Sequence, residues 1–289
     1  MEPDPDVVDE AVRGVPAPPL RPLVGWYSGY RQRGVPRARH RGLPSPYLTL
    51  ILTLDEPLRI AAHPDPAAAP GEYTAVLGGL HTTPAIIDVP GRQSGVQIAL
   101  GPLGARLLLG LPAGALAGAD LAAEDVLGPS VAEARERLRA AVDWPGRFAV
   151  IDGWLLGRAR LAAGGPGTPG PPPEIRHAWR LLTDSGGTVG VAALAAEVGW
   201  SDRRLRERFA AEVGLGPKAA ARVIRFDRTR RGLAADPERA GRLSALAAER
   251  GYFDQAHMDR EFRALAGCPP TGWLAEERRN IQSGHHPPG

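Results

Sequence analysis

The spacing of apolar residues changes character once along the chain. From Trp26 to about Leu100, short runs rich in β-branched and apolar residues are separated by turn residues, as in "PYLTLILTLD", "EYTAVLGGL" and "SGVQIALGP". Such runs, bounded by Gly, Pro and Asp, are typical of strands and predict an antiparallel sheet or small barrel. From Gly104 onward the pattern becomes helical, so helices are expected to follow the strands.

The stretch "GGPGTPGPPP", Gly164 to Pro173, separates two predicted domains. Pro and Gly at this density favour a semi-stiff linker over a helix or strand. We predict an α+β multidomain protein. A cupin-like barrel is one fold that its β-rich N-terminal domain could adopt. Its expected segments are a disordered tail (1–20), a β-rich domain with C-terminal helices (21–163), the linker (164–173), an all-α domain (174–282) and a second disordered tail (283–289).

One unit of the all-α domain occurs twice. Val191–Pro217 reads "VAALAAEVGWSDRRLRERFAAEVGLGP", and Leu243–Pro270 reads "LSALAAERGYFDQAHMDREFRALAGCPP". The residues from Ala193 recur 52 positions later, and the offset becomes 53 after Phe253, which is inserted in the second turn. Similarity over this length indicates a duplicated structural unit.

Each copy has the pattern of a helix-turn-helix unit. A short Ala/Leu helix ends at a glycine able to adopt positive φ, and Ser201 or Asp254 then supplies the oxygen that caps the next helix. Apolar residues four positions apart face inward in that second helix. The residues left facing outward are Asp202, Arg203, Arg206, Glu207, Gln255, Ala256, Asp259 and Arg260.

The segment Lys218–Leu233 joins the two units and is predicted to be a helix. A helix of about 16 residues is ~24 Å long, and it could hold two reading helices near the ~34 Å between successive major-groove faces. Arg222 and Arg225 on this helix are candidate phosphate contacts. A single copy would equally fit an ordinary helical hairpin with a solvated face, but two linked copies favour DNA binding.

The same residues resemble the AraC/XylS family of transcriptional regulators. The resemblance covers residues 176–279 and is carried by "GYFDQAHMDREFRALAGCPPTGW" and "VGWSDRRLRERFAAEVGLGPKAAARVIRFDRTRR". It implies a seven-helix domain that binds asymmetric DNA sites. Carried over by position, it assigns base reading to Arg203, Arg206, Glu207, Gln255, Ala256, Asp259 and Arg260.

The chemistry of these side chains suggests individual roles. Arginine pairs with guanine O6 and N7, and Gln255 can pair with adenine. Glu207 and Asp259 could accept from cytosine N4, or could only orient a neighbouring arginine. Ala256 departs from the family pattern because it can contact only a thymine methyl group.

Charge and composition add modest support. Residues 175–289 contain 19 Lys+Arg and 14 Asp+Glu, whereas residues 1–174 contain the remaining 16 and 18. A basic half beside a mildly acidic half suggests a polyanionic partner for one domain. The single Cys268 excludes an internal disulfide framework, and no apolar run reaches the ~18 residues of a membrane span. These features predict a soluble cytoplasmic protein that binds double-stranded DNA.

Catalytic motifs are absent from the sequence. It has no H-E-x-x-H, G-x-S-x-G, Walker-type or paired-cysteine pattern, and we expect no cofactor. His40, His63 and His81 form the only candidate metal cluster, but their spacing favours structural histidines. An enzyme with an accessory helical domain is therefore the weaker alternative, and its reactive-cysteine form lacks a cysteine outside the helix-turn-helix units.

The stretches "HRGLPSPYLTLILTL" and "GPLGARLLLGLPAGAL" also resemble the N-terminal region of actinobacterial AraC-type regulators. This resemblance implies a sensing and dimerising domain. We therefore predict a transcription factor controlled by a small-molecule effector, able to form a homodimer and to contact RNA polymerase if it activates. A constitutive DNA-binding protein with a purely dimerising N-terminal domain is the alternative. An apolar cavity with a few converging polar groups would favour the sensor.

Overall fold

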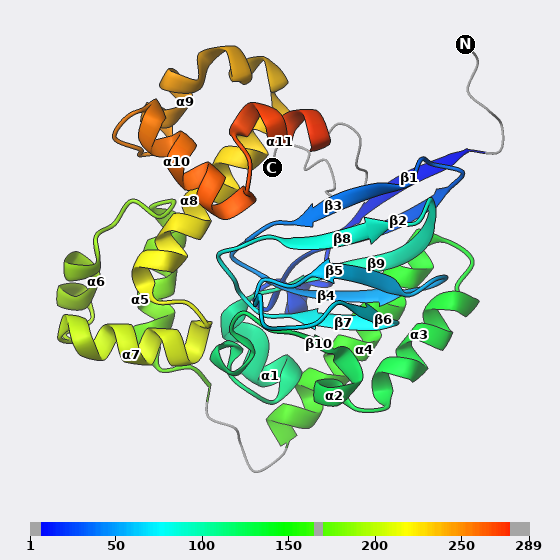
Figure 1. The fold of residues 1–289 in the computed structure, drawn as a ribbon. Coiled ribbons are helices and arrows are strands. Elements are labelled where there is room, and N and C mark those ends of the chain that lie inside the picture. Colours follow the sequence, from blue (N-terminus) through cyan, green and yellow to red (C-terminus); the bar gives the residue numbers. More distant parts are fainter. Residues whose placement is uncertain (1–6, 165–169, 278–289) are drawn as a thin grey trace.

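The computed structural model describes residues 7–164 and 170–277 and places two domains side by side (Figure 1). Two antiparallel sheets form the N-terminal domain. One has six strands in the order β1-β2-β9-β4-β7-β10, and the other has four in the order β3-β8-β5-β6. The strands are β1 (Val8–Gly14), β2 (Val24–Arg33), β3 (Ala38–Gly42), β4 (Leu48–Thr53), β5 (Leu58–Ala62), β6 (Gly71–Tyr73), β7 (Ala75–Gly78), β8 (Ala85–Val89), β9 (Arg92–Leu100) and β10 (Asp120–Ala122).

The predicted β-rich domain is confirmed, but within the described residues its two sheets remain separate and form no closed barrel. The expected disordered tail (1–20) is wrong from Val8 onward, because Val8–Gly14 pairs with β2 along its full length. The strand was missed because it lies at a sheet edge and carries charged residues. Glu10 forms an ion pair with Arg31 of β2 at 3.1 Å, which satisfies one of these charges across the pair.

Helices cover one face of the six-stranded sheet (Figure 1). They are α1 (Ala105–Leu109), α2 (Ala123–Leu127), α3 (Ser130–Ala140) and α4 (Trp144–Gly164). Aromatic packing fixes α4, since the rings of Tyr27 and Phe148 stack with centroids 5.8 Å apart. The hydroxyl of buried Tyr27 donates to Asp152 at 2.8 Å. The predicted change from strands to helices is therefore correct, apart from the late strand β10.

The C-terminal domain contains the two predicted helix-turn-helix units. Its helices are α5 (Pro173–Asp184), α6 (Val191–Glu197), α7 (Asp202–Val213), α8 (Pro217–Ala235), α9 (Leu243–Glu249), α10 (Gln255–Ala266) and α11 (Pro270–Glu277). The turns after α6 and α9 pass through Gly199 and Gly251 with φ of 68° and 76°, values that favour glycine. The linking helix predicted at 218–233 is α8. Residues 165–169 of the predicted linker (164–173) and the tail at 283–289 lie outside the described residues, whereas Gly164 ends α4 and Pro173 begins α5.

The two units bury their apolar side chains in different cores. In the first unit Leu194, Leu205 and Phe209 join the core that extends under the six-stranded sheet. In the second unit Met258 and Phe262 pack with other residues of α8 to α11 in a separate core. The first unit is therefore continuous with the N-terminal domain, whereas the second is a more independent body.

Candidate nucleic-acid interface and internal cavity

Both candidate reading helices begin at a side-chain cap. Ser201 precedes α7 and its hydroxyl accepts from the amide of Arg204 at 3.3 Å. Asp254 precedes α10 and accepts from the amide of His257 at 2.6 Å. Each cap fixes where its helix starts, and thus which side chains lie in its first turn.

The exposed face of α7 consists of charged side chains paired with one another. Arg203 donates to Glu207 at 2.9 Å, and Arg206 donates to Asp202 at 3.3 Å, each across one helical turn. Such exposed pairs contribute little to stability. The arginines can therefore exchange these partners for base edges or phosphates at small cost. The contact of Glu207 with Arg203 matches the orienting role that the sequence left open for it.

The exposed face of α10 is less charged. Gln255, Ala256 and Arg260 are exposed, whereas Asp259 is half-buried and its Oδ1 has no partner among the described residues. Phe253, in the turn just before this helix, is 93% exposed. The sequence showed Phe253 as an insertion but gave it no role. Its exposure beside Gln255 and Ala256 adds an apolar contact to the candidate reading face.

The expected phosphate contact of Arg225 is not supported by its surroundings. Its side chain is 12% exposed, and it donates to Glu261 of α10 at 3.0 Å and to the carbonyl of Gly187 at 3.0 Å. The ring of Tyr252 lies 5.0 Å from its guanidinium carbon. Arg225 therefore fastens α8 to the second unit. Arg222 also binds Glu261, at 3.0 Å, but it is more exposed and keeps its candidate phosphate role.

A partly buried ion pair fastens the first unit to the N-terminal domain. Arg106 of α1 makes two hydrogen bonds to Glu212 near the end of α7, at 2.8 and 2.7 Å. Next to it, Gly114 lies so close to α7 that a Cβ would overlap the carbonyl oxygen of Ala211. These contacts explain why the first unit and the N-terminal domain share one core. The ion pair could not be predicted from the sequence, because Arg106 and Glu212 lie far apart along the chain.

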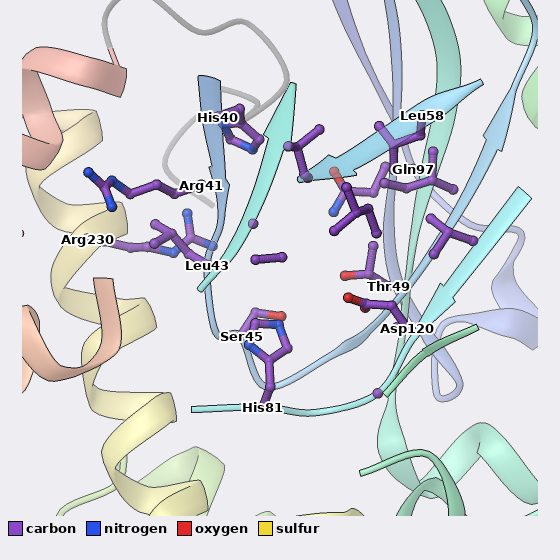
Figure 2. Close-up of a pocket in the computed structure, with 18 of the residues that line it drawn as sticks. His40, Arg41, Leu43, Ser45, Thr49, Leu58, His81, Gln97, Asp120 and Arg230 are labelled. Atoms are coloured by element: carbon purple, nitrogen blue, oxygen red, sulfur yellow. The ribbon is translucent and has the colours of Figure 1, made fainter. Parts of the chain in front are cut away.

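A cavity lies between the sheets and opens toward the C-terminal domain (Figure 2). Its volume is about 110 Å³. The wall is apolar, with Ile51, Leu58 and Val76 among its residues. Polar groups stand on two sides. The N-terminal domain contributes, among others, Arg41, Thr49, Gln97 and Asp120, and the C-terminal helices contribute Arg230 and Glu277.

A chain of hydrogen bonds orients Asp120 at the edge of the cavity. His63 Nδ1 lies 2.9 Å from Asp120 Oδ2, and the Tyr73 hydroxyl lies 3.4 Å from His63 Nε2. The side chains of His63 and Asp120 are only 2% and 9% exposed. His63 thus positions a carboxylate. No cluster of metal-ligating side chains occurs among the described residues.

Charged residues of both domains surround the mouth of the cavity. Arg41 of β3 binds Glu276 of α11 at 2.8 Å, and Arg230 of α8 binds Asp227 at 2.6 Å. Burial and the nearby Arg230 lower the pKa of His40 to about 4, so this imidazole is neutral at pH 7. The mouth is thus built partly from the helices that carry the second unit.

Two family models match parts of the chain. Residues 194–276 match a helix-turn-helix domain, and residues 13–122 match a domain of unknown function, DUF6597. No curated protein matches the sequence. The C-terminal domain is therefore a helix-turn-helix domain, and the predicted duplication accounts for two pairs of its helices, α6 with α7 and α9 with α10. Within the described residues no helix is both long and apolar enough to cross a membrane.

The whole fold is similar to that of ToxT from Vibrio cholerae. A ToxT structure at 1.65 Å resolution has a TM-score of 0.51 and 9% identity, covering 86% of this chain and 97% of that chain. A second, from strain O395, has a TM-score of 0.50 and 10% identity, covering 86% and 96%. The predicted fold class, a β-rich domain followed by an all-α helix-turn-helix domain, is confirmed. At these sequence identities the likeness concerns the fold alone.

Proposed function

We propose that the protein is a sequence-specific transcription regulator of the AraC type, in which α7 and α10 read successive major-groove segments of one DNA site. The observation that carries the proposal is the repeated exposed face, since two capped helices present arginines to solvent on either side of α8. The matched helix-turn-helix family supports it. The resemblance to actinobacterial members and action in the cytoplasm belong to the same proposal.

Base reading is assigned to the exposed faces of the two helices. Arg203 and Arg206 on α7, and Arg260 on α10, suit guanine, Gln255 suits adenine, and Ala256 suits a thymine methyl group. We assign phosphate contact to Arg222 on α8, because Arg225 is less exposed. Glu207 and Asp259 complete the assigned set, as acceptors from cytosine or as residues that hold the neighbouring arginines.

Control by a small-molecule effector is the second part of the proposal. It is supported by the cavity, which combines an apolar wall with polar groups from both domains. A ligand in contact with Asp120 on one side and Arg230 on the other would favour one placement of the second unit over others. The alternative, a constitutive DNA-binding protein whose N-terminal domain only dimerises, does not require such a cavity. The enzyme alternative is disfavoured by the helix-turn-helix family match. Self-association through the N-terminal helices and contact with RNA polymerase are further partners to test.

The DNA-binding part is tested by selection from random duplexes with the full-length protein, followed by titration of the recovered site at two salt concentrations. We expect a motif of two blocks about one helical turn apart. Arg206→Ala and Arg260→Ala should each weaken binding to this site by roughly 1–3 kcal/mol, with little change on random DNA. Recovery of no motif, or equal losses on random DNA, would refute base reading by these residues.

A further inference from the structure

Around Asp120 the lining of the cavity includes several hydrogen-bond acceptors, whereas the guanidinium groups of Arg41 and Arg230 lie toward the C-terminal helices (Figure 2). Asp120 contributes a carboxylate whose Oδ2 is held by His63, and whose Oδ1 lies beside Gly78. A Cβ on Gly78 would come 2.8 Å from this oxygen, so the glycine keeps the space next to the carboxylate open. Figure 2 shows Asp120 and Thr49 directed into the cavity from the same side. A ligand group placed against Asp120 must therefore bring hydrogen-bond donors.

His81, which also lines the cavity, presents a second acceptor. Its Nδ1 is hydrogen-bonded to the carbonyl oxygen of Thr83, and because a carbonyl only accepts, Nδ1 carries the proton. Burial lowers the pKa of His81, although Thr83 and Asp120 act in the opposite direction. In the neutral ring Nε2 is then an acceptor. The hydroxyl of Thr49 and the carbonyl of the Gln97 amide can accept as well.

From this arrangement we propose that the cavity binds a compact organic ammonium compound, with its charged –NH3+ group on Asp120 and His81 and its apolar body against the sheet residues. An ammonium group has three donors and no acceptor, which matches a carboxylate beside acceptor groups. Its charge also offsets that of Asp120, which lies in a largely apolar wall. Binding of an ammonium compound does not depend on the proposed function. Only the role of this compound as an effector rests on it.

The size and walls of the cavity define the rest of the ligand. At about 110 Å³ the cavity is smaller than the sites of drug-sized molecules, which occupy roughly 300–1,000 Å³. Ile51, Ile60 and Val76 form apolar wall on the side of the sheets. We infer a short branched or cyclic hydrocarbon body. The far end of such a ligand faces Arg230, so its binding is expected to affect α8.

The binding test uses three probes that share one body, namely 3-methylbutan-1-amine, 3-methylbutan-1-ol and 3-methylbutanoic acid. Calorimetric titration of the full-length protein without DNA keeps this test separate from the proposed DNA binding. We expect saturable binding of the amine, at least tenfold weaker binding of the alcohol, and none of the acid. The assignment is overturned if the acid or the alcohol binds as well as the amine, or if none of the three binds at millimolar concentration.

Two variants locate the ammonium group. Asp120→Asn keeps the size of the side chain but removes its charge, and should weaken amine binding at least tenfold. Because Asp120 also bonds His63, Thr49→Val provides a second variant that leaves this pair intact and should weaken the amine severalfold. Leu161→Ala, on the exposed surface of α4, is the matched control and should have no effect. Unchanged amine affinity in both cavity variants would place the probe elsewhere and refute the site.

Discussion

The two helix-turn-helix units have the same plan but are fastened to the protein in different ways. Each carries one buried glutamate on its second helix, α7 or α10. In the first unit Glu212 binds Arg106 of the N-terminal domain, whereas in the second Glu261 binds Arg222 and Arg225 of α8. At an offset of 53 the position of Glu212 is occupied by Leu265, and that of Glu261 by Arg208. The duplicated units therefore differ in which part of the molecule holds their second helix.

The two units also differ in how they are attached to the N-terminal domain. The first shares a core with the N-terminal domain and is held as part of that body. The second has its own core and meets the N-terminal domain through contacts near the mouth of the cavity, including Arg41 with Glu276. A ligand in the cavity would thus act on the second unit relative to a fixed first unit.

The largest expected effect is the loss of the anchor in the second unit. Glu261→Ala leaves the guanidinium of Arg225 buried without its carboxylate, which should lower the free energy of unfolding by about 3–5 kcal/mol. Denaturant unfolding of the full chain measures this loss. Arg208→Ala, at the equivalent exposed position of the first unit, is the matched control and should change stability very little. Equal effects of the two variants would contradict the proposed difference in anchoring.

The anchor of the first unit should be weaker, because Arg106 is 24% exposed. Glu212→Leu, which introduces the residue type found in the second unit, should cost roughly 1–3 kcal/mol by leaving Arg106 without its partner. Adding Arg106→Met should restore most of this loss, since apolar replacement of both partners is often neutral. A double-mutant cycle measures the coupling. Additive losses would show that the two side chains do not act as a pair.

The two caps should also differ in strength. Asp254→Ala is expected to cost about 1 kcal/mol of stability, and Ser201→Ala less, because the bond to the Asp254 carboxylate is shorter (2.6 against 3.3 Å) and charge-assisted. Thermal unfolding of the two variants under one set of conditions provides the comparison. A larger loss for Ser201→Ala would reverse the expected order.

The smallest effect concerns Phe253, which has no counterpart in the first unit. If its ring covers a thymine methyl group, replacing that thymine by uracil in the second block should weaken binding by about 0.8 kcal/mol, the value of one buried methyl-sized group. In Phe253→Ala the same replacement should have a much smaller effect. Anisotropy titration of matched duplexes tests this contact. If the thymine-to-uracil replacement weakens binding of Phe253→Ala as much as that of the wild type, Phe253 does not contact the methyl group, and Ala256 is the contact residue.

The sequence predicted what depends on local patterns. The turn glycines Gly199 and Gly251 and the caps Ser201 and Asp254 follow from residues that lie within one turn of each other, so the duplication located both units. The strand β1 was missed because an edge strand needs no continuous apolar run. The burial of Arg225 was also missed, because it depends on Glu261, which lies far away in the sequence.

The cavity could not be predicted from the sequence for the same reason. Its lining comes from strands of both sheets and from α8 and α11, and such positions become neighbours only through the packing of the two domains. The sequence contained Asp120 and His63 as ordinary polar residues 57 positions apart. Their pairing gave the carboxylate a fixed orientation, which is the basis for assigning a ligand class.

The most direct test of the account is an affinity profile of the selected DNA site, with each base pair replaced in turn, for the wild-type protein, Arg206→Ala and Arg260→Ala. We expect Arg206→Ala to abolish discrimination at one or two positions of one block, and Arg260→Ala to do so only in the other block. If both variants flatten the same positions, or if neither changes the profile, the two units do not read separate segments of the site.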